Sequence, residues 1–287
     1  MTVSYESLHP SDVFGGNLAP STSANTKGSY LEFDASTAFA VDSLHFTTRF
    51  YTASARQFLL DIATGAGGSE IVLVSNLLLQ GASEKGTVQF GIPVPVGSGL
   101  RIALRAAQSG TGSVTIHCIL HLIGGEAAHL LDSALAHTYG DVGASTDGTA
   151  VDPGGTASTK GSYVEITAAT STSNPIRWLI ALARTQNASA AQAYMYDIAT
   201  GAGGSETIIV PDRSLTTIGS ALYNSGQAGA VNIASGTRIA MRTLCGSNTN
   251  PDRINNFVLV GIEGTLPAGA GPGETVVVNR RARGGRR

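Results

Sequence analysis

Hydrophobic and polar residues alternate one by one along much of this chain, which is the period of a half-buried β-strand. In residues 113–123 every second position is apolar from Val114 onward, and the positions between them include His117 and His121. Residues 254–262 repeat this alternation, and clusters of Gly, Pro, Asn and Ser separate such segments at short intervals. Because many short strands with regular turns build pairs of packed sheets, the pattern predicts an all-β protein made of β-sandwich or jelly-roll-like domains.

The chain also contains two copies of one domain. Three blocks recur in the same order: residues 61–70 as 197–206, residues 26–30 as 159–163, and residues 99–105 as 236–242. The offsets are 136, 133 and 137 positions, and the first block is unchanged over all ten residues. Blocks that keep their order while the offset drifts slowly indicate a tandem duplication followed by small loop insertions. Two copies of this size favour two globular domains over a solenoid.

The blocks set the expected domain boundaries. We expect the first β-sandwich copy in residues 1–124 and the second in residues 139–266, with a linker at 125–138 between them. Residues 126–137 are rich in helix formers and contain no Gly or Pro, so this linker is either a connecting helix or an extended segment.

Residues 267–287 have no counterpart in the first copy and are expected to form a C-terminal extended arm. A Pro- and Gly-rich hinge comes first, then one short strand, then an arginine-rich end. A strand beyond a hinge has no partner in its own copy, so it is predicted to add to a sheet edge of a neighbouring subunit. The residues expected to dock are Val276, Val277, Val278, Arg280, Arg281, Arg283, Arg286 and Arg287. The valines favour a protein partner, and the arginines leave nucleic acid as an alternative at this tail alone.

Composition narrows the function classes. Charged residues make up 13% of the chain, about half of the usual share, and there are 36 glycines. A formal net charge of −2 excludes an overall positive field for nucleic acid. Neither a secretory signal nor an apolar stretch of the ~20 residues that span a bilayer is evident, so no membrane association is expected. Cys118 and Cys245 fall at unmatched places in the two copies, which favours two free buried thiols over a disulfide.

The glycine-rich block 61–70 is the first candidate for chemistry, because such loops can cradle phosphate at a helix start. Here strand-like residues follow the block and no Gly-Lys-Ser/Thr ending is present, so a hairpin loop with glycines at positive φ is predicted instead. Carboxylates in this block and arginines in the block 99–105 predict a network that locks loop to strand. Its members are Asp61, Glu70, Arg101 and Arg105, and in the second copy Asp197, Glu206, Arg238 and Arg242. A site for an anionic ligand is the alternative.

Other residues give no catalytic constellation. On a strand His117 and His121 lie ~13 Å apart, so they cannot share a metal ion. There is no Gly-x-Ser-x-Gly elbow, and no carboxylate has an identifiable acid/base partner in the sequence. Trp178 lies in an apolar segment and is expected in the core. We therefore expect no enzyme activity, no metal and no cofactor, with a glycan hydrolase kept as an alternative.

The block Asp-Ile-Ala-Thr-Gly-Ala-Gly-Gly-Ser-Glu, together with Gly-Thr-Arg-Ile-Ala-Met-Arg, resembles a repeat of structural proteins of tailed bacteriophages. The resemblance covers residues 20–124 and 153–264 and leaves out the C-terminal arm. Such proteins are virion components built from β-sandwich domains. The resemblance implies a non-enzymatic structural protein of the virion, assembled in the host bacterial cytoplasm, whose partners are further copies of itself and other virion proteins.

The resemblance leaves the position on the particle open. A tail, baseplate or fibre position is favoured, and a capsid decoration or head-spike protein is the alternative. A receptor- or glycan-binding adhesin on the same virion is a second alternative, for which Tyr139 and Tyr223 are the aromatic candidates. The copies diverge most between residues 75–98 and 211–235, so the two domains are expected to meet different neighbours.

Overall fold

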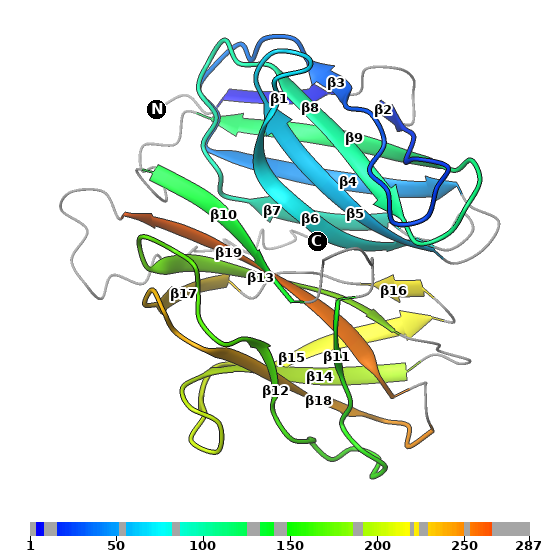
Figure 1. The fold of residues 1–287 in the computed structure, drawn as a ribbon, viewed down its shortest axis with the longest axis vertical. Coiled ribbons are helices and arrows are strands. Elements are labelled where there is room, and N and C mark those ends of the chain that lie inside the picture. Colours follow the sequence, from blue (N-terminus) through cyan, green and yellow to red (C-terminus); the bar gives the residue numbers. More distant parts are fainter. Residues whose placement is uncertain are drawn as a thin grey trace, which may run out of the picture.

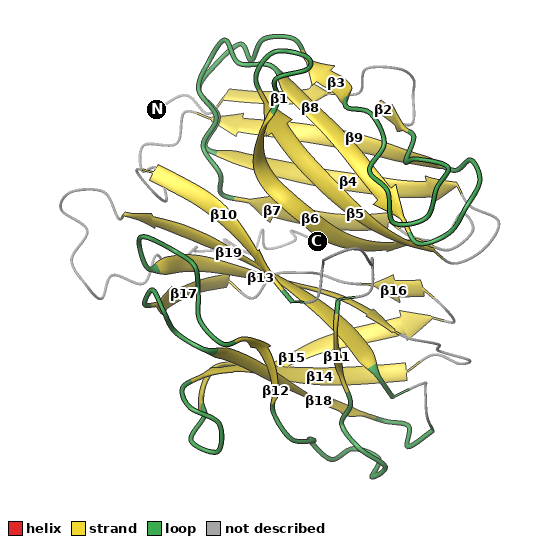
Figure 2. Cartoon of the chain, viewed as in Figure 1, coloured by secondary structure: helices red, strands yellow, loops and turns green. Residues whose placement is uncertain are grey.

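The protein is built from β-strands (Figure 2). The computed structural model describes residues 4–8, 16–51, 56–81, 87–124, 133–140, 148–185, 192–218, 221–223, 229–249 and 253–265. Within these ranges the chain forms strands and no helix, which confirms the all-β prediction. Accordingly, the described part of the chain has no helix of the length and apolarity that crossing a membrane requires.

The first domain consists of two antiparallel sheets. Sheet 1 has the strand order β1-β9-β4-β7, with β2 also pairing β9. Its strands are Ser4–Leu8 (β1), Gly16–Leu18 (β2), Ser43–Tyr51 (β4), Thr87–Ile92 (β7) and Thr115–Gly124 (β9). Sheet 2 has the order β3-β8-β5-β6 and contains Leu31–Asp34 (β3), Arg56–Thr64 (β5), Ile71–Gly81 (β6) and Ile102–Gln108 (β8).

The second domain repeats this arrangement. Sheet 3 has the order β10-β19-β13-β17, with β11 also pairing β19. Its strands are Ser133–Tyr139 (β10), Thr149–Val151 (β11), Ile176–Thr185 (β13), Gly229–Ile233 (β17) and Asn255–Thr265 (β19). Sheet 4 has the order β12-β18-β14-β15-β16 and contains Val164–Thr167 (β12), Gln192–Thr200 (β14), Thr207–Ile218 (β15), Ala221–Tyr223 (β16) and Ile239–Cys245 (β18). The repeated blocks therefore occupy the same strands and loops in both copies.

Strand β9 shows how the alternating sequence makes a sandwich core. Its apolar positions, such as Cys118 and Leu120, are buried, and each residue between them is half-buried. Leu120 lies opposite Phe46 of β4, and both belong to the buried cluster of the first domain. The alternation predicted from the sequence is thus confirmed, with His117 and His121 on the outward face of sheet 1.

Apolar residues cover both faces of sheet 3. On β19, Phe257 and Leu259 pack in the core of the second domain. Val258, Val260 and Ile262, which point the other way, belong instead to the buried cluster of the first domain. The buried cluster of the first domain therefore extends onto the outer face of sheet 3, so residues of both domains share this core.

The strand of the first domain that lies against sheet 3 is β6, which contacts β10, β13 and β19 (Figure 1). At this contact the Thr138 hydroxyl donates to the backbone oxygen of Ser75. Leu77 and Leu78 of β6 are buried, whereas the residues 136 positions later, Arg213 and Ser214 of β15, are exposed. The sequence divergence after residue 75 therefore has a physical reason, since one copy is covered at this strand and the other faces solvent.

The expectation of a linker up to residue 138 is wrong for residues 133–138. These residues belong to β10, which pairs antiparallel with β19 from Ser133 opposite Thr265 to Tyr139 opposite Leu259. Helix propensity is a weak preference, and pairing with the buried β19 overrides it. Residues 125–132 and the whole C-terminal arm, 266–287, lie outside the described residues.

Candidate functional site

The repeated glycine-rich block forms the hairpin loop between β5 and β6, and its second copy joins β14 to β15. Gly65 and Gly68 adopt positive φ angles of 93° and 85°, and Gly201 and Gly204 adopt 106° and 81°. These angles favour glycine because a Cβ atom would clash with the neighbouring backbone. In the first copy the backbone N–H of Gly68 donates to Oε2 of Glu70, 3.0 Å away. The loop is therefore held by its own carboxylate rather than arranged around an open phosphate cradle.

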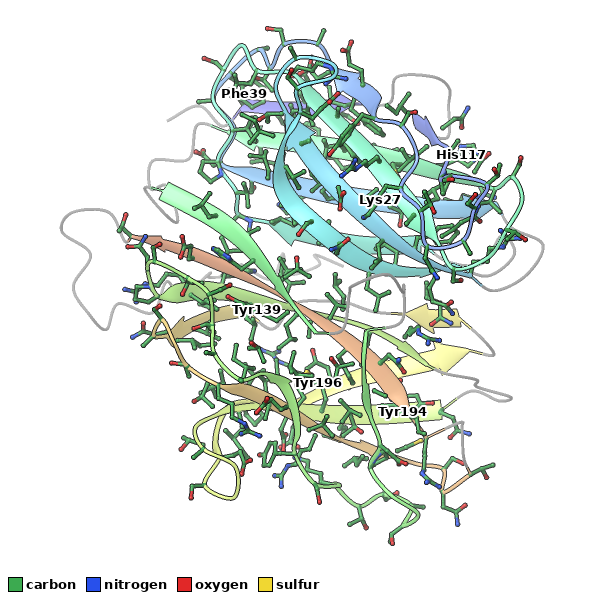
Figure 3. The ribbon with its side chains drawn as sticks, viewed as in Figure 1. Lys27, Phe39, His117, Tyr139, Tyr194 and Tyr196 are labelled. Atoms are coloured by element: carbon green, nitrogen blue, oxygen red, sulfur yellow. The ribbon has the colours of Figure 1, made fainter. Side chains whose placement is uncertain are left out.

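Asp61 is the centre of a buried charge cluster on the outward side of sheet 2. Lys27 Nζ lies 2.7 Å from Oδ1 of Asp61, and Arg105 Nε lies 2.9 Å from Oδ2. The backbone N–H of Asn76 also donates to Oδ1, at 2.9 Å. The Arg105 guanidinium in turn stacks over the Tyr30 ring, 4.6 Å from its centroid. The Asp61 carboxylate is thereby compensated by two cations and a backbone donor. Figure 3 labels Lys27.

The second copy reproduces this cluster almost atom for atom. Asp197 has no exposed surface and accepts from Lys160 at 2.7 Å, from Arg242 at 2.8 Å and from the backbone N–H of Asp212 at 2.9 Å. The Arg242 guanidinium lies 4.7 Å from the ring centroid of Tyr163. Identical contacts in two domains that differ elsewhere indicate a role in holding the fold common to both.

A second cluster lies at the hairpin loop itself. Arg101 contacts Glu32 at 2.7 Å and Glu70 at 3.2 Å, and it donates to the backbone oxygen of Gly65 at 3.1 Å. Each guanidinium thus ties a carboxylate of the edge strand to the loop, which is the loop-to-strand network that the sequence predicted. Arg238 makes the matching contacts with Glu165 at 2.7 Å, Glu206 at 3.2 Å and the backbone oxygen of Gly201 at 3.0 Å.

All eight predicted network residues therefore lie in these clusters, but the sequence analysis missed seven further side chains. They are Lys27, Tyr30 and Glu32, with Lys160, Tyr163, Glu165 and Asp212 in the second copy. The signal was present, because the repeated block 26–30 contains the lysine and the tyrosine. Its glycine is also required by packing, since a Cβ on Gly28 would lie 2.6 Å from the backbone oxygen of Ala19.

One substitution makes the two clusters electrostatically different. Asn76 and Asp212 occupy the same position, with positive φ angles of 54° and 49°. In the first copy burial lowers the pKa of Lys27, and the single carboxylate of Asp61 offsets this only in part. In the second copy burial also opposes the charge of Lys160, but the hydrogen bonds that its ammonium donates to the Asp197 and Asp212 carboxylates outweigh this effect and raise the pKa of Lys160. The second cluster is the more strongly compensated of the two.

The chemistry available to these clusters is limited. Burial raises the pKa of Asp197, but hydrogen bonds from the Asp212 backbone, Lys160 and Arg242 outweigh this effect and lower the pKa below its usual value. Such a carboxylate stays ionised at neutral pH and has its oxygens occupied, so it is unsuited to accept or donate a proton in a reaction. Among the described residues, no group of three or more His, Cys, Asp or Glu side chains is arranged to hold a metal ion.

The two cysteines are buried, whereas Trp178, expected in the core, is half-buried at its edge. Cys118 and Cys245 are buried and are not joined in a disulfide, and burial raises the pKa of the Cys118 thiol to about 12. Trp178 of β13 packs against the apolar cluster shared with the first domain, so it stabilises the contact between the copies.

The aromatic side chains relevant to an adhesin differ from those expected. Tyr139 is buried in the second domain (Figure 3) and cannot contact a ligand on the surface. The side chain of Tyr223 lies outside the described residues. Tyr5 of β1, which the sequence analysis did not select, is instead 61% exposed. The sequence offered a signal for this exposure. Alternation along β1 from the buried Leu8 places Tyr5 on the outward face.

Comparisons with known proteins give solved structures of low similarity only. No protein-family model and no curated protein matches it. A structure described as PNGF-II in a C2 space group aligns with a TM-score of 0.39 and 9% identity over 91% of this chain, which spans 65% of the length of that structure. The tandem CBM22-1-CBM22-2 domains of Paenibacillus barcinonensis Xyn10C align with a TM-score of 0.26 and 11% identity, over 92% of this chain and 91% of theirs. The PBSX exported protein XepA aligns with a TM-score of 0.23 and 10% identity, over 84% of this chain and 86% of its own. Identities of this size carry no information on activity or ligand.

Proposed function

We propose that this chain is a non-enzymatic structural component of a bacteriophage virion, in the tail, baseplate or fibre, with a head-decoration position as the alternative. It assembles in the host cytoplasm with further copies of itself and with other virion proteins. The observation that carries the proposal is the shared core of the two domains. Together with the phage-like repeated blocks, this core describes a rigid building block rather than two tethered modules.

The contact between the copies supports rigidity because its buried residues are apolar. Val258, Val260 and Ile262 of β19 are buried beneath the first domain, and Ile180 and Leu182 of β13 lie in the same cluster. Domains that move relative to each other are joined by smaller and more polar contacts. A block with fixed geometry can present its surfaces to neighbours in one orientation, which a symmetric particle requires.

The charges support a structural role as well. Only 13% of the residues are charged, and the repeated clusters use several of them in contacts within each domain. Both copies keep the same clusters although their surfaces have diverged. Selection on a substrate site would be expected to preserve a cleft in one copy, whereas selection on stability preserves equivalent internal contacts in both.

The proposal is tested by removing residues 267–287 and measuring how much of the chain is incorporated into phage particles. We expect the truncated chain to keep the circular dichroism spectrum and melting temperature of the full chain, but to be lost from purified particles. A matched variant with Arg280, Arg281, Arg283, Arg286 and Arg287 changed to Gln separates the arginines from the valine strand. If the strand is the docking element, this variant is still incorporated.

Two outcomes of this experiment would contradict the proposal at different levels. Normal incorporation of the truncated chain would show that the arm is not the assembly element. Absence of the full-length chain from purified particles, measured by mass spectrometry of the virion, would refute the virion role itself.

A further inference from the structure

The first residues of β6 lie on an open edge of sheet 2. β6 stands last in the strand order β3-β8-β5-β6, so within the described part of the chain β5 is the strand that pairs with it. Its contact with sheet 3 is reached at Ser75, whose backbone oxygen accepts a hydrogen bond from Thr138. Residues 71–74 precede that contact, at the hairpin end of the strand (Figure 1). A strand edge presents backbone N–H and C=O groups to which a further strand can add.

The side chains at this edge are apolar although they are exposed. Ile71 is 66% exposed and Val72 is 40% exposed, and Leu100, which leads into β8, is 41% exposed. The described residues include six large hydrophobic side chains with such exposure, so half of them belong to this end of sheet 2. Ile71 shares a row with Ile102, which follows Leu100 by two positions. Exposed apolar side chains that gather in one place mark an interaction site.

The equivalent end of the second copy lacks two of these three side chains. Thr207 and Thr237 stand at the positions of the isoleucine and the leucine, and only Ile208, 41% exposed, remains apolar. Pro211 follows in the same strand, β15, and a proline on a strand edge removes a backbone donor. Both copies form the same hairpin, so the hairpin itself does not require the apolar side chains of the first copy.

Carboxylates outnumber guanidinium groups at this end of the first domain. Glu32 and Asp34 lie on the opposite edge strand, β3, in the two rows that end at the exposed side chains of β6. Glu70 of the hairpin adds a third carboxylate, and Arg101 contacts Glu32 and Glu70. The lysine–aspartate–arginine cluster of this domain begins two rows further along the sheet. In the second copy Thr167 replaces Asp34, so the excess of negative charge is larger at the first copy.

The C-terminal arm has a sequence that complements this edge. It lies outside the described residues, and it contains three successive valines, 276–278, followed by five arginines. Valine is a preferred strand residue, and arginine pairs with carboxylates. The ten residues between Thr265 and the valines reach up to ~35 Å when extended, which is enough to leave one molecule and contact another. The eight residues after Asn279 reach about 25 Å, whereas β3 lies three strands, ~14 Å, from β6.

We propose that the edge of β6 at residues 71–74 accepts the valine segment 276–278 of a neighbouring copy of this chain as an added strand. The valines contact Ile71 and Val72, the two backbones pair, and the arginines that follow reach the three carboxylates beside the edge. This inference rests on the proposed role of the C-terminal arm in assembly and names the surface that receives the arm. Because arm and edge are different surfaces, each copy gives its arm to one neighbour and receives the arm of another.

Disulfide trapping between full-length chains tests this contact. A Val72→Cys chain is mixed with a Val277→Cys chain under mild oxidation, and the dimer that joins the two variants is measured on non-reducing gels. The matched control mixes Ile208→Cys with Val277→Cys, since Ile208 and Val72 are equally exposed at the same position of the two copies. We expect the Val72→Cys mixture to form the dimer more than about tenfold faster, because docking raises the effective concentration of the two thiols.

The register of the added strand is measured in the same way. Val276→Cys and Val278→Cys replace Val277→Cys in turn, and trapping should alternate along the segment, because successive side chains of a strand point to opposite faces. Uniform trapping at the three positions would contradict an added strand.

Particle incorporation gives an independent measurement. Val72→Lys places a charge on the edge, a device that blocks strand addition, and it should be lost from purified particles. Ile208→Lys is its control and should be incorporated normally. Both positions are exposed, so both variants should keep the melting temperature of the unchanged chain.

Three trapping results would overturn the proposal. The first is equal trapping by Val72→Cys and Ile208→Cys. The second is a dimer of Val72→Cys alone that forms as fast as the mixture, which would mean that two β6 edges pair with each other. The third is a chain carrying both Val72→Cys and Val277→Cys that closes a disulfide within itself at high dilution, which would place the arm on its own domain.

The incorporation results separate this inference from the proposed function. If removal of residues 267–287 abolishes incorporation but Val72→Lys is incorporated normally, the edge is not the acceptor and the virion role stands. If the truncated chain is incorporated normally, the proposed role of the arm fails and this inference fails with it.

Discussion

Leu77 and Arg213 offer a direct test of the shared core, because they occupy the same position of the two copies in opposite surroundings. Leu77 of β6 is fully buried, whereas Arg213 of β15 is exposed. Leu77 lies opposite Leu60, and Arg213 lies opposite Tyr196, so both side chains stand at equivalent places on an edge strand. Changing each to Ala compares a buried position with an exposed position at the same place on this strand.

The expected cost follows from what each side chain loses. Complete burial of a leucine side chain stabilises by about 1.5–3 kcal/mol, and the cavity left by truncation adds to this. We therefore expect Leu77→Ala to lower the free energy of unfolding by about 2–5 kcal/mol. Arg213→Ala should change it by no more than about 0.5 kcal/mol, as is usual for exposed positions.

Urea unfolding followed by circular dichroism and by tryptophan fluorescence measures both values. Trp178 reports on the contact between the copies because it packs there. The two probes should give coincident transitions, since a shared core couples the domains. A loss below about 1 kcal/mol for Leu77→Ala would contradict its burial in this cluster, and two separate transitions in the unchanged chain would refute a core shared by the two domains.

Three further perturbations test the charge cluster, a repeated glycine and a buried thiol. The pKa of Asp197 is lower in the folded protein than in the unfolded chain. Its ionised carboxylate therefore adds to the free energy of unfolding above the unfolded pKa of about 4, and this stabilisation is lost as the pH falls through the folded-state pKa. Asp197→Asn should therefore cost about 1–3 kcal/mol at neutral pH and flatten the acid dependence of urea unfolding; an unchanged acid limb contradicts this. Gly28→Ala should lower the melting temperature measured by calorimetry, because the new Cβ would lie 2.6 Å from a backbone oxygen. Gly67→Ala is the control, since its Cβ would enter open space and should leave the melting temperature unchanged. Equal effects of the two variants would count against the close packing around Gly28. Burial raises the pKa of the Cys118 thiol to about 12, so the thiol stays protonated at mildly alkaline pH. A disulfide reagent should therefore label it only after unfolding. Rapid labelling of the folded chain would disprove its burial.

Local sequence patterns predicted the strands and the duplication because both depend on neighbouring residues. The alternation of β9 is visible without knowing its partners, and an unchanged ten-residue block needs no structure to be recognised. The network residues were also accessible, since loop carboxylates and strand arginines recur together. Lys27 was missed because it reaches Asp61 across 34 positions of the chain, a contact that no local pattern specifies.

The burial of sheet 3 on both faces was harder to predict, although β19 contained a signal. Residues 257–260 are continuously apolar, which is typical of a strand buried on both sides. Reading only every second residue of this segment concealed that feature. Residues 133–138 were misjudged for a related reason, since their helix-forming composition carries no information about pairing with β19.

The contact between the copies uses different surfaces on each, β6 of the first and the outer face of sheet 3 of the second. In a one-domain ancestor such a contact would not be self-limiting, because every molecule would offer both surfaces and would add further molecules without end. In the present chain the two leftover surfaces are polar, with Arg213 and Ser214 on β15 and with His45 and His121 on sheet 1. The series of contacts therefore stops at two domains, and growth into larger assemblies is left to other parts of the chain.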